Sequence, residues 1–174
     1  GDRLYEYLAA RLPAQVTERL HTHDRPIDLT GVRAVVLGTG RVGLGAIDRL
    51  RDEYGVSVLG IDSDEDKIYK LRQRGYNVLE ADATDPDFWD KLLISDSVEL
   101  VLLAMPDHSG NVFATEQLNN RKFSGRLAAI VKYSEEIDVL REHGVNAVFH
   151  LYDEAGAEIA DKAAEAAGLR PIHE

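Results

Sequence analysis

From residue 32 onward, short apolar runs alternate with segments in which apolar residues recur every three or four positions. Continuous apolar runs are typical of strands covered on both faces, and the three-to-four spacing is typical of amphipathic helices. The runs predict six strands, at residues 32–37, 56–61, 77–80, 98–104, 127–131 and 147–150. The periodic segments predict six helices, at residues 45–54, 64–74, 85–93, 110–121, 134–143 and 153–167.

This strict alternation of strand and helix predicts an α/β fold. Strands joined through helices run parallel, with right-handed crossovers. Six such units make a doubly wound parallel sheet of strand order 3-2-1-4-5-6. For the last helix we expect Asp153 as N-cap and Gly168 just beyond the C-terminus, at the C′ position.

The first 29 residues follow a different pattern. Leu4, Leu8, Leu12, Val16 and Leu20 form a helical apolar stripe, which Pro13 interrupts. Residues 21–29 have the composition of a linker. The stripe fits a helix packed on the domain's own core, or a connector to another domain or partner. We expect a lead-in at 1–29, a domain at 30–168 and a tail at 169–174.

Composition narrows the classes of function. The 174 residues hold 20 Lys+Arg and 31 Asp+Glu, a formal net charge of −11. This balance argues against nucleic acid and against an anionic membrane surface as partners. There is no cysteine, which removes disulfide scaffolds and thiol chemistry. No apolar run approaches the roughly 20 residues that span a bilayer. Because the chain starts at Gly1 and not Met, we expect a fragment of a longer protein.

The clearest motif is Gly38-Thr39-Gly40-Arg41-Val42-Gly43, which follows the first predicted strand and opens a helix. This G-x-G-x-x-G pattern is shared by Rossmann-like folds. Its first glycine permits a tight turn, its second lets the backbone approach a pyrophosphate, and its third lets helix and strand pack closely. The helix N-terminus and Arg41 then favour a phosphate.

An acidic residue lies at the position where this motif requires one, at the end of the second predicted strand. Asp62 ends the second strand, 24 residues after Gly38, and Ser63 follows it. A carboxylate there accepts hydrogen bonds from ribose hydroxyls and repels a 2′-phosphate, so NAD or plain adenosine ligands are favoured over NADP. The alternative is a solvated Asp that caps the next helix.

A second candidate group follows the third strand, in Asp82-Ala83-Thr84. In a doubly wound sheet this loop lies along the adenine, where Asp82 could accept from the exocyclic amine and Ala83 could pack on the ring. The alternative is a helix N-cap, for which Thr84 or Asp85 already suffices.

The turn after the fourth strand supplies Ala104, Met105 and Pro106. Ligands of open α/β sheets bind at the carboxyl ends of the strands near the switch point, so these residues are expected to line the crevice. Asn111 is predicted to open the next helix, where its amide could reach a phosphate or ribose, or where it simply belongs to the helix turn.

Catalytic groups are sparse. Lys132 and Tyr133 follow the fifth strand, where an anion contact or a solvated Lys is a simpler interpretation than catalysis. His108 and His150 lie at strand ends, with no carboxylate at a recognisable relay spacing. Hydride transfer needs a substrate site, which dehydrogenases commonly carry on a second domain, and 174 residues leave no room for one. We find no metal-ligand pattern.

The motifs GTGRVG, VSVLGID, EADATD and LLAMPD, with the Lys132 region and residues 140–148, resemble the regulator-of-potassium-conductance (RCK, KTN or TrkA-N) domain. The resemblance covers about residues 29–165 and is nearest to the cytoplasmic C-terminal domain of Kef-type cation:proton antiporters. The residues that carry over are Gly38, Gly40, Arg41, Asp62 and Asp82. The chain lacks the Arg-rich segment that Kef proteins often show after the fifth strand, so glutathione binding is not implied.

The resemblance implies a nucleotide sensor rather than an enzyme. Such domains bind NAD(H), AMP or a related adenine nucleotide, dimerise through late helices, and act on a membrane transporter from its cytoplasmic face. The lead-in would then connect to a preceding membrane domain. Two alternatives stay open: the cofactor half of an NAD-dependent oxidoreductase, and a dimeric interaction module whose nucleotide is structural.

Overall fold

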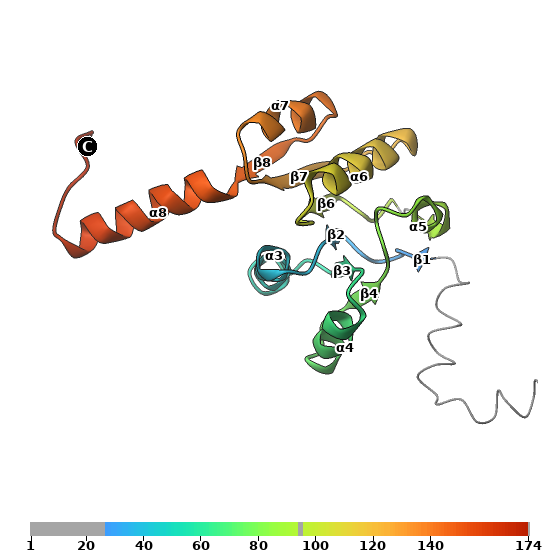
Figure 1. Cartoon of the computed structure of the whole chain (residues 1–174). Coiled ribbons are helices and arrows are strands. Elements are labelled where there is room, and N and C mark those ends of the chain that lie inside the picture. The colour runs from blue at the N-terminus through green and yellow to red at the C-terminus, as the bar shows by residue number, and fades with distance from the viewer. Residues whose placement is uncertain (1–26, 94–95, 174) are drawn as a thin grey trace, which may run out of the picture.

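A computed structural model describes residues 27–93 and 96–173 (Figure 1). Its centre is a six-stranded sheet in the order β4-β3-β2-β6-β7-β8, and every neighbouring pair is parallel. The strands are β2 (Ala34–Leu37), β3 (Val58–Asp62), β4 (Val78–Glu80), β6 (Leu100–Leu103), β7 (Arg126–Val131) and β8 (Ala147–His150). The predicted strand order 3-2-1-4-5-6 is therefore confirmed. The predicted helical stripe at the N-terminus lies outside the described residues.

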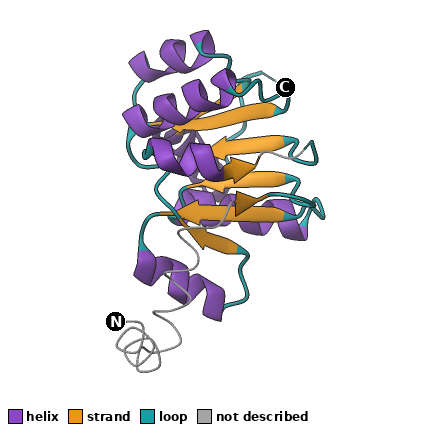
Figure 2. Ribbon diagram, turned by 90° about the vertical axis from the view of Figure 1, so that its right-hand side faces the viewer, coloured by secondary structure: helices purple, strands orange, loops and turns teal. Residues whose placement is uncertain are grey.

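Helices cover the two faces of the sheet (Figures 1 and 2). Ile47 of α3 and Ile68 of α4 pack on one face, and Trp89 of α5, Leu118 of α6 and Leu140 of α7 pack on the other. The helices are α3 (Arg41–Asp52), α4 (Glu65–Gln73), α5 (Pro86–Lys91), α6 (His108–Asn120), α7 (Glu135–Glu142) and α8 (Leu151–Ala166). The chain thus forms three layers around a doubly wound sheet.

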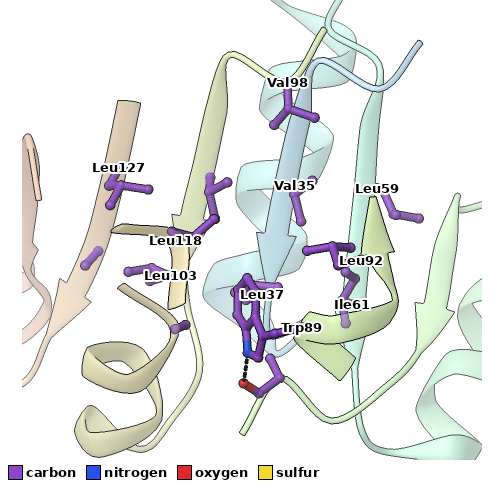
Figure 3. Close-up of a cluster of buried hydrophobic side chains, with 14 of the residues drawn as sticks. Val35, Leu37, Leu59, Ile61, Trp89, Leu92, Val98, Leu103, Leu118 and Leu127 are labelled. Carbon is purple, nitrogen blue, oxygen red and sulfur yellow. Dashed lines mark hydrogen bonds between the residues drawn. The ribbon is translucent and has the colours of Figure 1, made fainter. Parts of the chain in front are cut away.

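The core lies on both sides of β2, whose four residues are all buried. Val35 and Leu37 point into the larger cluster, while Ala34 and Val36 point into the smaller one, as the alternation of strand side chains requires. Figure 3 shows Trp89 beside Leu37. Its indole Nε1 donates a 2.8 Å hydrogen bond to the carbonyl of Ala83, which ties the core to a loop at the carboxyl edge of the sheet.

A small second sheet was not predicted. Ile27–Asp28 (β1), placed in the linker by composition, pairs in parallel with Leu92–Leu93 (β5). The predicted helix at 85–93 ends at Lys91, because the next two residues are extended in this pair. Leu29 and Leu92 are both buried in the larger core cluster, so apolar contacts hold the pair in place.

Three helices begin earlier than predicted, at Arg41, His108 and Leu151. The prediction that Asp153 is the N-cap of the last helix is wrong, because His150 occupies that position. Asp153 lies in the first turn and its Oδ2 pairs with His150 Nδ1 at 2.7 Å. At the other end Gly168 adopts φ +73° directly after the C-cap, which confirms its predicted position.

The last helix, α8, extends away from the sheet (Figure 1). None of its 16 residues is buried. Isolated helices of this length are marginal in water, and burial within the domain contributes little to the stability of α8. Within residues 27–93 and 96–173, every helix is too short or too polar to span a bilayer.

Candidate functional site

A cavity of about 580 Å³ opens at the carboxyl ends of the strands. Twelve of the thirteen predicted site residues line it: Gly38, Gly40, Arg41, Val42, Asp62, Ser63, Asp82, Ala83, Thr84, Ala104, Met105 and Pro106. Eight further residues line the cavity, and of these the sequence offered only Lys132, as an anion contact or a solvated Lys: Ile61, Lys67, Ala81, Asp107, Gly110, Ile130, Lys132 and Leu151. Cavities of this size lie within the range typical of small-molecule sites, about 300–1,000 Å³.

The glycine turn lines the cavity through Gly38 and Gly40. Its three glycines differ in the space that a Cβ would find around them. Gly38 has φ +99°, and a Cβ there would lie 2.5 Å from the carbonyl oxygen of Ala104. At Gly43 a Cβ would overlap the carbonyl oxygen of Gly38. At Gly40 a Cβ would meet nothing within 4 Å, so this position faces open space in the cavity. The first and third glycines are thus required by packing, and the second leaves room for a ligand.

Helix α3 begins directly at this turn. Gly40 is its N-cap and provides no side-chain hydrogen bond, and no acidic residue lies in the first turn. The amide groups and positive dipole end of α3 are therefore not offset by a carboxylate from the helix's own first turn. With Arg41 at the first helical position and on the cavity wall, this end of the cavity favours an anionic group.

Asp62 at the end of β3 connects the glycine turn to the next helix. Its Oδ2 accepts hydrogen bonds from the backbone N–H and the Oγ1 of Thr39, both at 2.9 Å, and its Oδ1 accepts from the N–H of Asp64 at 2.9 Å. Thr39 is the predicted site residue that does not line the cavity. It is 3% exposed and acts by holding Asp62.

The environment of Asp62 also sets its charge. Burial alone favours the neutral carboxyl, but hydrogen bonds from Asp64 and Thr39, and the nearby ammonium of Lys67, outweigh burial and lower the pKa of Asp62. The carboxylate is therefore ionised at neutral pH and accepts, rather than donates, hydrogen bonds.

This lowered pKa predicts a pH dependence of stability. A carboxyl group whose pKa is lower in the folded state stabilises the fold above its unfolded value, 3.8, and loses that contribution as pH falls through the folded value. We expect the difference in unfolding free energy between the unsubstituted chain and Asp62→Asn to shrink as pH is lowered below 4. Urea unfolding from pH 2.5 to 7 measures this. A difference that stays constant across that range contradicts the argument.

Asp82 also lines the cavity and accepts hydrogen bonds from its own loop. Its Oδ1 accepts hydrogen bonds from the N–H and the Oγ1 of Thr84, at 2.9 and 2.6 Å. The N-cap of α5 is Asp85, whose side chain accepts from Asp87 N–H. The alternative that Asp82 is the N-cap of this helix is therefore wrong. Asp82 and Ala83 both line the cavity, and the carbonyl of Ala83 accepts the hydrogen bond from Trp89.

Asn111 does not reach into the cavity. It is 1% exposed in the first turn of α6, its Oδ1 accepts from Met105 N–H at 3.2 Å, and its Nδ2 donates to Met105 O at 3.0 Å. The hypothesis that this amide contacts phosphate or ribose is therefore wrong. Asn111 instead fixes the Met105 backbone, which lines the cavity.

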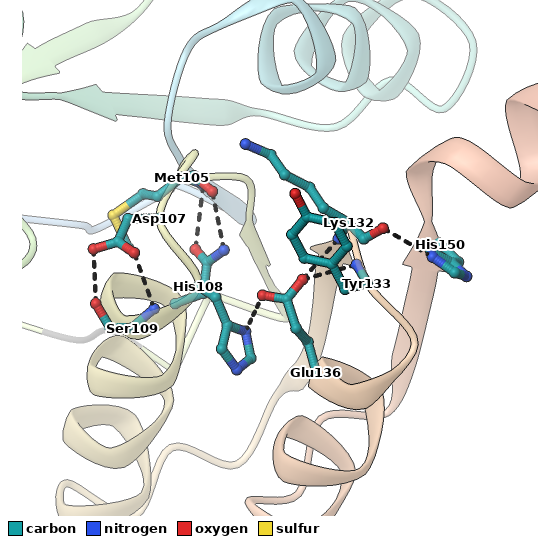
Figure 4. Close-up of polar contacts among 9 residues, drawn as sticks. Met105, Asp107, His108, Ser109, Lys132, Tyr133, Glu136 and His150 are labelled. Atoms are coloured by element: carbon teal, nitrogen blue, oxygen red, sulfur yellow. Dashed lines mark hydrogen bonds and ion pairs between the residues drawn. The ribbon is translucent and has the colours of Figure 1, made fainter.

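A second polar group lies beside the cavity, at the ends of β6, β7 and β8 (Figure 4). Glu136 Oε1 accepts from the backbone N–H groups of Lys132 and Tyr133, and Glu136 Oε2 lies 3.3 Å from His108 Nδ1. His150 Nε2 contacts Lys132 O at 3.0 Å. Two carboxylates, Glu136 and Asp153, thus lie near histidines, which sequence spacing did not reveal.

This group supports the backbone and lies outside the main cavity. Of its members only Lys132 lines that cavity, while His108 and Glu136 border an adjacent space of about 10 Å³. Across the described part of the chain, no three His, Cys, Asp or Glu side chains are placed to hold a metal ion.

The parallel strand order with its glycine turn at the switch point defines a Rossmann-like α/β domain. Residues 34–151 match the TrkA-N domain, and the chain belongs to this family, also called RCK. The resemblance seen in the sequence motifs is thereby confirmed. No curated protein matches the chain significantly.

Several solved structures have the same fold as this chain. The NAD(P)-binding domain of an exopolyphosphatase-related protein from Archaeoglobus fulgidus is 26% identical, with TM-score 0.67 over 77% of this chain and 98% of that one. The TrkA-N domain of the inner membrane protein YbaL from Escherichia coli is 17% identical, with TM-score 0.62 over 74% and 94%. The GsuK RCK domain is 23% identical, with TM-score 0.64 over 79% of this chain and only 29% of that one.

Proposed function

We propose that this chain is a regulatory domain that binds an adenine nucleotide, NAD(H) or AMP, in the cavity at the carboxyl edge of its sheet. The observation that carries the proposal is the pairing of an uncapped helix N-terminus at Gly40 with an ionised Asp62 on the same wall. The first suits a phosphate and the second a ribose hydroxyl. Ala83 and Asp82 then line the place for the adenine.

Related structures support this class of ligand. GsuK structures have been solved with NAD and with ADP bound, and the archaeal neighbour is an NAD(P)-binding domain. The chain that carries the GsuK RCK domain is a channel, and YbaL is an inner membrane protein. We extend this to the present chain as a domain of a monovalent cation transporter of the antiporter type, on the cytoplasmic face of the membrane, whose transport changes with nucleotide occupancy.

The second candidate is the cofactor half of an NAD-dependent oxidoreductase. The observation in its favour is that the same cavity and Asp62 would suit NAD equally well. Against it, neither His108 nor Glu136 lines the main cavity. Reduction of NAD⁺ above background with a panel of alcohols and hydroxy acids would favour this candidate over the sensor.

The nature of the bound nucleotide is the direct test. The protein purified under native conditions is denatured and the released small molecules are identified by mass spectrometry. The proposal expects NAD(H), AMP or a related adenine nucleotide, exchangeable with added NADH or AMP. A ligand without adenine contradicts it, and an adenine nucleotide that never exchanges favours a purely structural role.

We also propose that the domain forms a homodimer through α8. This helix has no buried residue, and Tyr152 and Ile159 on it are 57% and 65% exposed. Residues Tyr152, Gly156, Ile159 and Ala163 recur at three- and four-residue intervals and share one face. A second copy of the chain would bury this face.

Replacing Ile159 with Glu is expected to shift the protein toward monomer, because a charge would enter the proposed apolar contact. Glu158→Gln, on the adjacent polar face of the same helix, is the matched control and should leave the oligomeric state unchanged. Sedimentation velocity over a range of concentrations measures both. If the unsubstituted chain sediments as a monomer at every concentration, the dimer proposal is wrong.

A further inference from the structure

Lys67 lies beside Asp62, at the end of the cavity where we propose that the ribose binds. It belongs to none of the motifs recognised in the sequence. It lies in the first turn of α4, five residues after Asp62, and lines the cavity. Its Nζ is 3.4 Å from Asp62 Oδ2. The Lys67 side chain is 40% exposed and that of Asp62 only 12%, so the ammonium is at the mouth and the carboxylate is deeper.

The contacts of Asp62 leave it little capacity for a ligand. A carboxylate has two oxygens with about four acceptor positions in all. Within the described residues, Oδ2 faces three donors, namely the N–H and Oγ1 of Thr39 and the Nζ of Lys67, while Oδ1 takes the N–H of Asp64. This leaves room for one ribose hydroxyl, at Oδ1. The neighbouring hydroxyl of the same ribose would then lie beside Lys67, whose ammonium can donate to it.

The charges at this end are otherwise acidic. Asp64 caps α4, and Glu65 and Asp66 occupy its first turn together with Lys67. Two basic residues of the last turn, Lys70 and Arg72, do not line the cavity. Of the basic residues of α4 named here, Lys67 is therefore the one whose charge offsets that of Asp62. It does so at the place where the 2′-position of a bound ribose would lie.

We propose that Lys67 is a specificity-determining residue of the cavity, which lowers the discrimination that Asp62 imposes against adenine nucleotides carrying a 2′-phosphate. The proposal rests on the function proposed above. A carboxylate alone repels a 2′-phosphate, whereas an ammonium next to it offsets that carboxylate's charge and supplies a charged donor to the phosphate. The cavity thus accepts both the plain and the 2′-phosphorylated ribose, with Lys67 setting the ratio.

The test uses AMP and adenosine 2′,5′-bisphosphate, which differ only by the 2′-phosphate. Calorimetric titration of the full chain gives a Kd for each and hence a selectivity ratio. We expect the unsubstituted chain to bind the two within about tenfold, and Lys67→Gln to raise the preference for AMP by about a further tenfold, the usual effect of losing one charged hydrogen bond.

Two matched variants make the result specific. Lys70→Gln removes the same charge from an exposed position on the same helix that does not line the cavity, and its ratio should stay within about twofold of the unsubstituted value, since exposed charges are screened. Lys67→Arg keeps the charge and should keep the ratio near that of the unsubstituted chain.

The outcomes separate the two proposals. If AMP binds but Lys67→Gln leaves the ratio unchanged, or changes it no more than Lys70→Gln does, the role of Lys67 is refuted while nucleotide binding stands. A ratio already above a hundredfold in the unsubstituted chain also refutes it. If neither probe binds the unsubstituted chain and NADH does not bind it either, the proposed function itself fails.

Discussion

Replacing Gly43 with alanine is expected to destabilise the domain by about 3 kcal/mol and to remove nucleotide binding, the largest effect of any single change considered for this chain. A Cβ at Gly43 would overlap the carbonyl oxygen of Gly38, which belongs to the backbone and cannot turn aside as a flexible side chain could. Helix α3 would have to shift from β2, and the turn that faces the cavity would shift with it. Urea unfolding and calorimetric titration with AMP measure both effects.

Gly45 is the matched control, two residues further along the same helix. A Cβ there meets nothing within 4 Å, so Gly45→Ala should stabilise the chain by about 0.5–1 kcal/mol, the usual gain from replacing glycine within a helix. The two substitutions make the same chemical change in the same helix with opposite expected signs. Equal effects would mean that close packing at the glycine turn is not what Gly43 provides.

Replacing Asp62 with alanine is expected to weaken the binding of AMP and NADH by about 1–3 kcal/mol, or roughly fivefold to 150-fold. The change removes the acceptor for a ribose hydroxyl and also leaves the donors of Thr39 and Asp64 without their partner. Unfolding and calorimetric titration on the same variant separate the loss of stability from the loss of affinity.

Thr39→Val separates the two roles of Asp62. Thr39 does not line the cavity, and its Oγ1 donates to Asp62 at 2.9 Å. We expect this variant to lose stability with a smaller loss of affinity than Asp62→Ala, because the carboxylate stays on the wall. Unchanged affinity in Asp62→Ala would refute the ribose assignment.

The sequence was a good guide to the fold because most of the information lies in local patterns. Buried strands such as Ala34–Leu37 are short apolar runs, and the helices between them fix a parallel order. The β1–β5 pair could not be predicted, because two-residue strands have no periodicity and Ile27 and Leu92 are 65 positions apart. The start of α8 was misplaced because Asp153 is a good N-cap residue by type, yet the helix begins two residues earlier, at Leu151.

For the cavity, residues in a known motif were predicted and residues defined by tertiary contact were not. Gly38 and Asp62 are fixed by spacing along the chain, and both line the cavity. Lys67 and Leu151 line it because α4 and α8 begin at the carboxyl edge of the sheet, which spacing alone does not reveal. Asn111 has the right type for a ligand contact, but its amide matches the two backbone groups of Met105 instead.

The central claim is that the cavity beside Gly40 and Asp62 binds an adenine nucleotide. One calorimetric titration of the full chain tests it most directly, with NADH and AMP added in turn to protein stripped of bound nucleotide. The account predicts saturable binding of one nucleotide per chain, with AMP and NADH competing for the same site. No binding of either nucleotide up to millimolar concentration, by a chain that is folded, would contradict it.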